Sequence, residues 1–265
     1  MRTLSTTFIF ILIFNIYAFA QKPVLKTLWA GNDSLYLSTL EIEGYPTQLV
    51  FEKIHSKFGN IRKSFMYNVS GDTLKVKNYP ASDTGDFIMD TLKKGELVLT
   101  PVNQQASYYM VAATLASAQK HYRFKDITTV TNDIKFEKLL FHSTNCYGFC
   151  PAITLEIDYN RKVRYIGGKF AVKQGQFEGK LSLQLYAQLT NLLKTADLDK
   201  LVGNTLHNVD APDYTIEVHY NHKVLYLNTM EVPFAIEPLK TMLLDMPRNV
   251  NWTPASAPVT INFTK

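Results

Sequence analysis

A short internal repeat constrains the fold of this chain more than any other feature of its sequence. Residues 151–165 (PAITLEIDYNRKVRY) and 212–226 (PDYTIEVHYNHKVLY) carry the same residue at eight of fifteen positions without a gap. Each copy alternates apolar and polar residues, passes a polar turn at Asn160 or Asn221, and alternates again. This pattern is typical of a β-hairpin. The repeat therefore predicts two related hairpins.

Each hairpin is followed by a segment with helical periodicity. Apolar residues recur at three- and four-residue spacing in residues 181–196, where Ser182 is a candidate cap, and in residues 234–246, which Pro247 is expected to end. Two hairpins and two helices can bury one sheet face under a helical layer. We therefore expect residues 133–253 to form a duplicated ββα module, an antiparallel sheet packed by two helices with a pseudo-twofold relation.

The preceding half of the chain has the pattern of an antiparallel β meander. Gly71 and Gly95 supply turn chemistry between alternating segments. Residues 29–112, with Trp29 near their start, resemble the small lipocalin-like domains of exported bacterial proteins. The resemblance implies a small β-barrel or half-barrel, either filled by side chains or able to enclose an apolar ligand. The expected strands are Leu35–Glu43, Gln48–Lys53, Phe65–Val69, Thr73–Asn78, Asp86–Leu92, Leu97–Pro101 and Ser107–Ala112.

The N-terminus has the pattern of a cleavable secretory signal. Arg2 precedes a nearly unbroken apolar run over residues 8–18, and Ala18-Phe-Ala20 is a small-x-small cleavage site before Gln21. We expect a secreted or periplasmic protein without an integral membrane segment after cleavage. Its parts would be a signal peptide (1–20), a β-rich domain (21–125), the duplicated module (133–253) and a C-terminal tail (254–265). The fold class is α+β.

Charge and motifs restrict the classes of function. The net charge of +5 is spread along the chain rather than clustered, which argues against a nucleic-acid partner. The sequence lacks four common catalytic and nucleotide-binding motifs: the nucleophile elbow G-x-S-x-G, the zinc motif H-E-x-x-H, the P-loop and the dinucleotide motif G-x-G-x-x-G. We therefore expect no cofactor and a binding protein rather than an enzyme, with a protein, peptide or glycan as its partner.

The two cysteines of the chain, Cys146 and Cys150, stand just ahead of the first repeat. An exported protein with one pair favours a disulfide, and Gly148 can adopt the geometry that closes so short a loop. The alternative is a functional thiol pair. Two sulfurs of a C-x-x-x-C-P motif could exchange disulfides or bind Cu(I), with His142 as a third ligand. Other histidines that could serve are His207, His219 and His222.

The segment Cys146-x-Gly148-x-Cys150-Pro151, followed by an alternating strand, resembles an uncharacterised domain family of exported bacterial proteins. The resemblance runs from Lys135 to Trp252. Members of that family also carry an acidic and a small residue before the second hairpin, where this chain has residues 210–213 (DAPD). The resemblance bears on the fold and implies no activity.

One acidic cluster leaves an enzymatic alternative open. Asp210 and Asp213 flank Ala-Pro in a turn near His207, and could take part in acid-base chemistry or bind a divalent ion. Such carboxylates more commonly cap a turn. The favoured function is therefore a binding module stapled by Cys146 and Cys150, with thiol chemistry and this acid site as alternatives.

Overall fold

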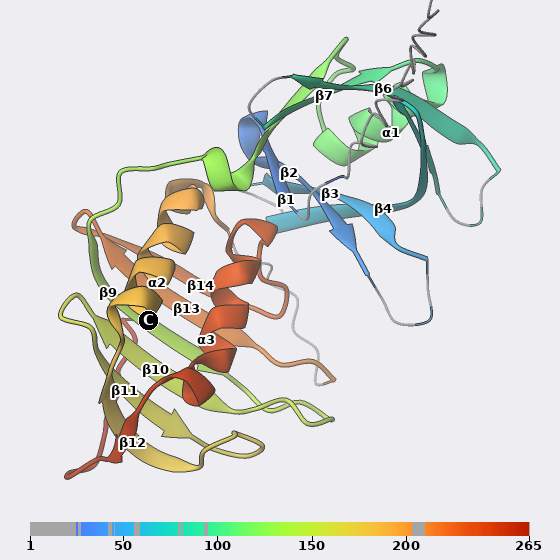
Figure 1. Cartoon of the computed structure of the whole chain (residues 1–265). Coiled ribbons are helices and arrows are strands. Elements are labelled where there is room, and N and C mark those ends of the chain that lie inside the picture. Colours follow the sequence, from blue (N-terminus) through green and yellow to red (C-terminus); the bar gives the residue numbers. More distant parts are fainter. Residues whose placement is uncertain are drawn as a thin grey trace, which may run out of the picture.

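The structure is a computed structural model with two parts, a β-barrel and a seven-stranded sheet covered by two helices (Figure 1). Both the expected signal segment and His207 lie outside the described residues. Those residues are 25, 28–41, 44, 46–55, 59–78, 80, 82–92, 95–202 and 210–264.

The barrel is closed by eight antiparallel strands in sequential order, with β1 paired to β8. Its interior is packed with apolar side chains that include Leu49, Phe51, Phe87 and Phe124. The meander expected from the sequence is therefore a complete barrel. Its strands are β1 (Leu28–Gly31), β2 (Leu35–Leu40), β3 (Gln48–His55), β4 (Gly59–Ser70), β5 (Thr73–Lys77), β6 (Thr84–Leu92), β7 (Glu96–Pro101) and β8 (Tyr122–Asp126).

The strand expected at residues 107–112 is wrong, because this segment belongs to helix α1 (Gln104–Thr114). The Asn103 side chain caps the helix by accepting a hydrogen bond from the Ala106 amide at 2.8 Å. The buried face of α1 packs into the barrel core. It lies so close to β6 that a Cβ on Gly85 would come within 2.9 Å of the Ala106 Cα. Tertiary packing thus overrides a locally alternating sequence.

The second part is a sheet in the order β14-β13-β9-β10-β11-β12-β15, and two helices cover one of its faces (Figure 1). The helices are α2 (Leu183–Thr195) and α3 (Glu237–Asn249). The strands are β9 (Phe136–Ser143), β10 (Ile153–Asp158), β11 (Lys162–Gly167), β12 (Gly175–Lys180), β13 (Tyr214–Tyr220), β14 (Lys223–Thr229) and β15 (Trp252–Pro254). The described residues also form short 3-10 helices, η1 (Asn32–Ser34), η2 (Ile127–Thr129), η3 (Leu198–Lys200) and η4 (Phe234–Ile236).

Both expected helices exist, with one corrected end. Ser182 caps α2 by accepting a hydrogen bond from the Leu185 amide at 3.1 Å, as the sequence predicts. The prediction that Pro247 ends α3 is wrong, because the helix continues to Asn249. A proline in the last turn removes only one backbone hydrogen bond, and Met246 and Pro247 are both buried there.

The two copies of the repeat form hairpins β10–β11 and β13–β14, on opposite sides of β9. Their first strands have the same register, since Phe141 of β9 lies opposite both Leu155 and Ile216. β10 and β13 therefore run parallel and face the same core, while their second strands extend in opposite directions across the sheet. A half-turn about the axis of β9 would exchange the two faces of the sheet, so the structure does not show the expected pseudo-twofold relation. β12 also intervenes before α2, and the structure does not show two equivalent ββα units.

The core between the sheet and its helices also includes Leu28, Tyr36 and Ile54 of the barrel. The strand registers align six residues in one row across six barrel strands. We call these residues the interface row, which consists of Arg62, Glu52, Tyr36, Ala30, Lys125 and Glu96 in spatial order.

One end of the interface row binds the segment before α3. The Glu52 carboxylate is fully buried, accepting a hydrogen bond from the Phe234 amide at 2.7 Å and pairing with Arg62 at 2.8 Å. Arg62 also donates to the Val232 carbonyl at 2.6 Å and lies over the Phe234 ring. We call these four residues the Glu52 latch. It joins barrel and sheet through both charge and backbone contacts.

The C-terminal segment lies on the sheet face opposite the helices. The Val259 amide donates to the Gln176 side chain at 2.7 Å. Further along, the Thr264 amide and hydroxyl donate to Glu217 at 2.7 and 2.9 Å. Glu217 is fully buried and also contacts His219 at 2.5 Å. The segment thus runs from β12 to β13. Among the described residues, no helix is long and apolar enough to cross a membrane.

Candidate functional site

Cys146 and Cys150 form a disulfide, as the sequence favours, with an S–S distance of 1.97 Å and a Cα–Cα distance of 5.4 Å. The bridge closes the connection between β9 and β10 at one end of the sheet. Closing so small a ring stabilises the fold by about 2 kcal/mol on loop-entropy grounds. Its main effect is therefore local, on the shape of the loop.

Hydrogen bonds fix both sides of this loop. Before it, the Thr144 amide donates to the Asp213 carbonyl at 3.0 Å, and the Asp213 amide donates to the Thr144 hydroxyl at 2.9 Å. After it, the Ser143 hydroxyl donates to the Pro151 carbonyl at 2.6 Å, and the Ala152 amide donates to the Lys169 carbonyl at 2.9 Å. The loop is thus held by its own bridge and by two neighbouring connections.

The loop presents aromatic rings to solvent. Tyr147 is 92% exposed and Phe149 is 87% exposed, on either side of Gly148. The Phe149 ring packs edge-on against Phe170, with 5.3 Å between ring centroids. Val172, in the same connection as Phe170, is 57% exposed. We call Tyr147, Phe149, Phe170 and Val172 the aromatic tip.

Phe170 holds an unusual backbone conformation, with φ of 60°. A bulky residue at positive φ is rare, and the strain persists only where the surroundings impose it. Close contacts do so here. The Tyr165 hydroxyl donates to the Lys173 carbonyl at 2.7 Å, and a Cβ on Gly167 would lie 1.9 Å from that oxygen. The folded connection therefore holds the Phe170 ring beside the disulfide loop.

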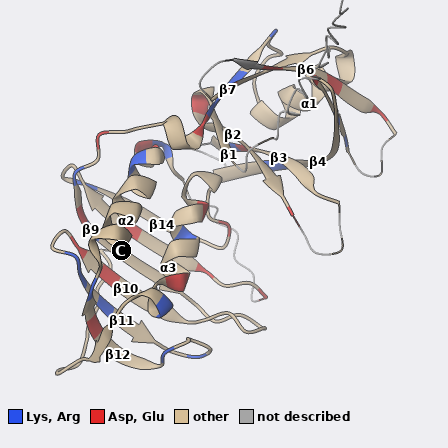
Figure 2. Cartoon of the chain, viewed as in Figure 1, with Lys and Arg blue, Asp and Glu red and all other residues tan. Residues whose placement is uncertain are grey.

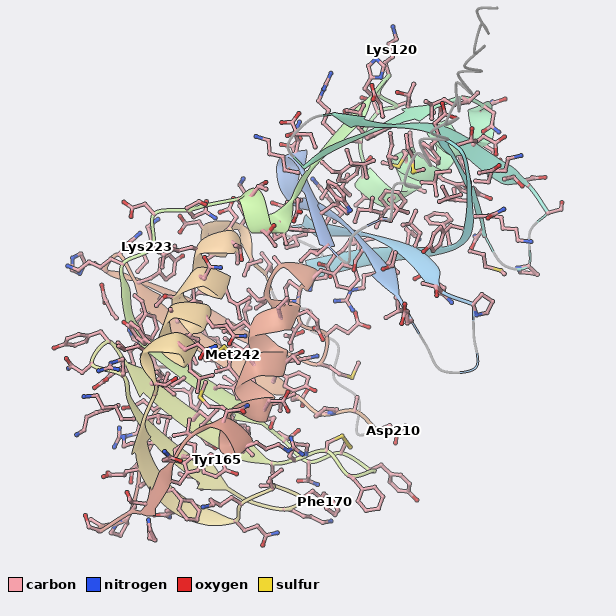
Figure 3. All side chains as sticks on the ribbon, in the orientation of Figure 1. Lys120, Tyr165, Phe170, Asp210, Lys223 and Met242 are labelled. Carbon is pink, nitrogen blue, oxygen red and sulfur yellow. A yellow bond between two sulfur atoms is a disulfide. The ribbon has the colours of Figure 1, made fainter. Side chains whose placement is uncertain are left out.

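Two lysines lie in the same connection as Phe170. The Lys169 ammonium lies 4.6 Å from the centroid of the Phe170 ring, and the Lys173 ammonium lies 4.9 Å from that of Phe177. Figure 3 shows Phe170 and Asp210 at the same end of the sheet, while Lys223 lies at the other. The aromatic tip is thus an apolar knob with lysines beside it.

The possible thiol and metal site is not assembled in this state of the protein. The disulfide occupies both sulfurs, and His142 Nδ1 lies 2.9 Å from the Thr154 hydroxyl. Burial lowers the pKa of His142. No cluster of three or more His, Cys, Asp or Glu side chains able to hold a metal ion occurs in the described ranges. Thiol or copper chemistry therefore stays a prediction for the reduced protein.

The acid site is only partly visible. Asp210 and Asp213 lie in the connection that precedes β13, beside the disulfide loop through the backbone bonds of Asp213. His207, the third member of this predicted site, lies outside the described residues. His219 contacts Glu217, and exposed His222 lies 3.5 Å from Glu137 at the opposite end of the sheet.

The candidate site residues that sequence reasoning missed are Tyr147 and Phe149. Their signal was present, because two aromatic residues flank the glycine of a loop closed by cysteines. A loop of that size has no interior, so its large side chains must point outward.

Comparison with known proteins finds a similar domain family but indicates no activity. Residues 137–246 match the model of a family described as a domain of unknown function (DUF6438). No curated protein and no solved structure matches the chain. From β9 into α3, this chain is therefore similar to a domain family whose function is not established.

Proposed function

We propose that this chain is an exported two-domain binding protein, with domains at residues 21–125 and 133–253, that uses the aromatic tip to bind a partner protein. The observation that carries the proposal is the exposure of Tyr147 and Phe149, 92% and 87%, on a disulfide-closed loop. Exposed contiguous apolar groups are uncommon on soluble proteins and mark interaction surfaces. Aromatic anchors also dominate the binding energy of many protein interfaces.

The shape of the tip favours a protein over a small ligand. Side chains as exposed as Tyr147 and Phe149 line no concave wall, so the partner must supply the pocket. The disulfide fixes the loop before binding, which reduces the entropy lost on association. Lys169 and Lys173 favour acidic residues at the rim of that pocket.

The test is site-specific photocrosslinking in cells that export the protein. A photoreactive phenylalanine analogue replaces Tyr147 in the full chain. The matched control carries it at Tyr159, a 64% exposed tyrosine at the far end of β10. We expect one protein to crosslink at position 147 and not at position 159, and Phe149→Ala to weaken that purified complex by roughly tenfold or more.

Two results would refute this proposal. One is equal crosslinking at positions 147 and 159. The other is retention on insoluble cell-wall glycan that depends on Tyr147 and Phe149 while no protein crosslinks, which would make the aromatic tip a glycan-binding surface. Reduction of the Cys146–Cys150 bridge should weaken protein binding without unfolding the chain, because the bridge mainly orders the loop.

A further inference from the structure

A cavity of about 290 Å³ lies where the barrel meets the end of α2, along the part of the interface row that begins at Tyr36, next to Glu52 of the latch. Its barrel wall includes Tyr36, Ala30 and Lys125 of the row together with Arg123 of β8. Its other wall includes Asp197 and Lys200, which follow α2. Figure 2 shows residues of both charge signs at this junction.

The register of the strands explains why space remains here. Ala30 lies directly opposite both Tyr36 and Lys125, so a methyl group stands between two long side chains. The connection from β8 to β9 passes alongside, with Asn132 tied to the Lys194 and Ala196 carbonyls at 3.1 and 3.0 Å. The walls are thus fixed by paired strands and by backbone bonds.

Tyr36 brings a hydroxyl group without a described hydrogen-bond partner to the wall of this cavity. The residue is only 4% exposed and lines the cavity, yet no described group hydrogen-bonds to its hydroxyl. A buried tyrosine usually finds a partner for this group. Burial, and then the negative charges of Asp197 and Glu52, raise its pKa, so the hydroxyl stays protonated and can donate.

The charges around the cavity leave one positive charge in excess. Lys200 pairs with Asp197 at 2.8 Å, and Glu96 lies opposite Lys125 in the strand register. Arg123 forms no ion pair within the described part of the chain, and it also lines a second, smaller cavity of about 40 Å³ next to the first. A guanidinium with free donors matches the geometry of a carboxylate.

We propose that this cavity binds a small hydroxylated monocarboxylate, with its carboxylate on Arg123 and Lys125 and an oxygen that accepts the hydrogen bond of Tyr36. Glu96 and Asp197 then accept hydrogen bonds from the hydroxyl groups of the ligand. The site is separate from the aromatic tip, and it stands whether or not that tip binds a protein. A ligand bound here would touch both barrel and sheet and would strengthen their contact.

The test is calorimetric titration of the mature full-length protein with lactate, gluconate and glucuronate. Glucose serves as the uncharged probe and glucose 6-phosphate as the more highly charged one. We expect at least one monocarboxylate to bind and glucose not to bind. Arg123→Gln should weaken binding roughly tenfold or more, and Tyr36→Phe roughly three- to tenfold. Arg248→Gln, which removes the same charge from exposed α3, should leave the affinity unchanged.

Three results would overturn the assignment. The first is that none of the three carboxylates binds. The second is an affinity that Arg123→Gln leaves intact, and the third is tighter binding of glucose 6-phosphate than of any carboxylate. Because the measurement concerns small molecules alone, failure of the aromatic tip to crosslink a protein would not change its outcome.

Discussion

The Glu52 latch and the cavity beside it differ in how their polar groups are satisfied. At the Glu52 latch, both carboxylate oxygens accept hydrogen bonds and Arg62 donates to the opposite backbone. At the cavity, the Tyr36 hydroxyl and the Arg123 guanidinium have no described partner. If this surface only joined the two domains, hydrogen-bond partners for the polar groups at the cavity would stabilise it further. The difference separates contacts that hold the two parts together from a neighbouring cavity left open for a ligand.

The largest effect should come from breaking the latch. Arg62→Met leaves the Glu52 carboxylate buried without its cation, and we expect a loss of about 3 kcal/mol in the free energy of unfolding. Arg164→Met removes a similar pair with Glu156, whose side chains are 38% and 18% exposed, and should cost less than about 1 kcal/mol. Urea unfolding of both variants measures the contrast. Equal losses would show that the latch is no stronger than a surface pair.

The dependence of stability on pH should distinguish the two buried carboxylates, Glu52 and Glu217. Burial raises the pKa of Glu52 above its usual value of 4.5, so the folded state holds its proton more tightly than the unfolded state. Its contribution to stability is thus present below pH 4.5 and is lost as pH rises through the raised pKa. In Glu52→Gln this loss disappears. The measurement is the free energy of unfolding between about pH 4 and about pH 8.

Glu217 should show the opposite dependence on pH. Burial alone would raise its pKa, but hydrogen bonds from Thr264 and His219 lower it below the usual 4.5. Its contribution is present above pH 4.5 and is lost as pH falls through the lowered pKa. Comparing Glu217→Gln with the wild type at acidic pH measures this. A wild-type chain as stable below the lowered pKa as above it would contradict the prediction.

A smaller effect should separate two buried tyrosines. Tyr165 donates its hydroxyl to the Lys173 carbonyl at 2.7 Å, so Tyr165→Phe should cost about 1 kcal/mol. Tyr36→Phe removes a hydroxyl without a described partner and should change stability by less than about 0.5 kcal/mol. Thermal unfolding of the two variants without added ligand provides the comparison. An equal cost at Tyr36 would mean that its hydroxyl is already satisfied.

The smallest effect concerns Arg123. In the absence of ligand, Arg123→Gln should change the free energy of unfolding by no more than about 0.5 kcal/mol, because the side chain is exposed and unpaired among the described residues. Chemical denaturation checks this. A substantial loss would make Arg123 a structural residue and would weaken its assignment to a ligand.

Local patterns in the sequence predicted the elements and missed their assembly. Turn glycines and alternation identified most barrel strands, and Ser182 marked the start of α2. The strand assigned to residues 107–112 was wrong because its apolar residues fit either period, whereas the Asn103 cap and packing against Gly85 favour a helix. β8 lies where the sequence pattern weakens, since it becomes a strand by pairing with β1 and β7.

The candidate site was likewise predictable only where local features of the sequence determine it. Composition and cysteine count predicted the Cys146–Cys150 bridge, and the exposed rings beside it follow from loop size. Phe170 could not be found, because it reaches Phe149 from a separate connection. The cavity at Tyr36 and Arg123 depends on registers between strands that are distant in sequence.

The position of β9 between the two hairpins bears on how the sheet forms in time. Each hairpin needs only local contacts, and Ser143 meets Ile153 after a short connection. Ser143 also pairs with Tyr214, which lies much further along the chain. Strand pairings between such distant residues form slowly. We therefore expect the rate of folding to depend on β13 joining a preformed β9–β10–β11 unit. A change at Ile216 should therefore slow refolding more than one at Leu155, and the opposite order would make the β9–β10–β11 unit itself the nucleus.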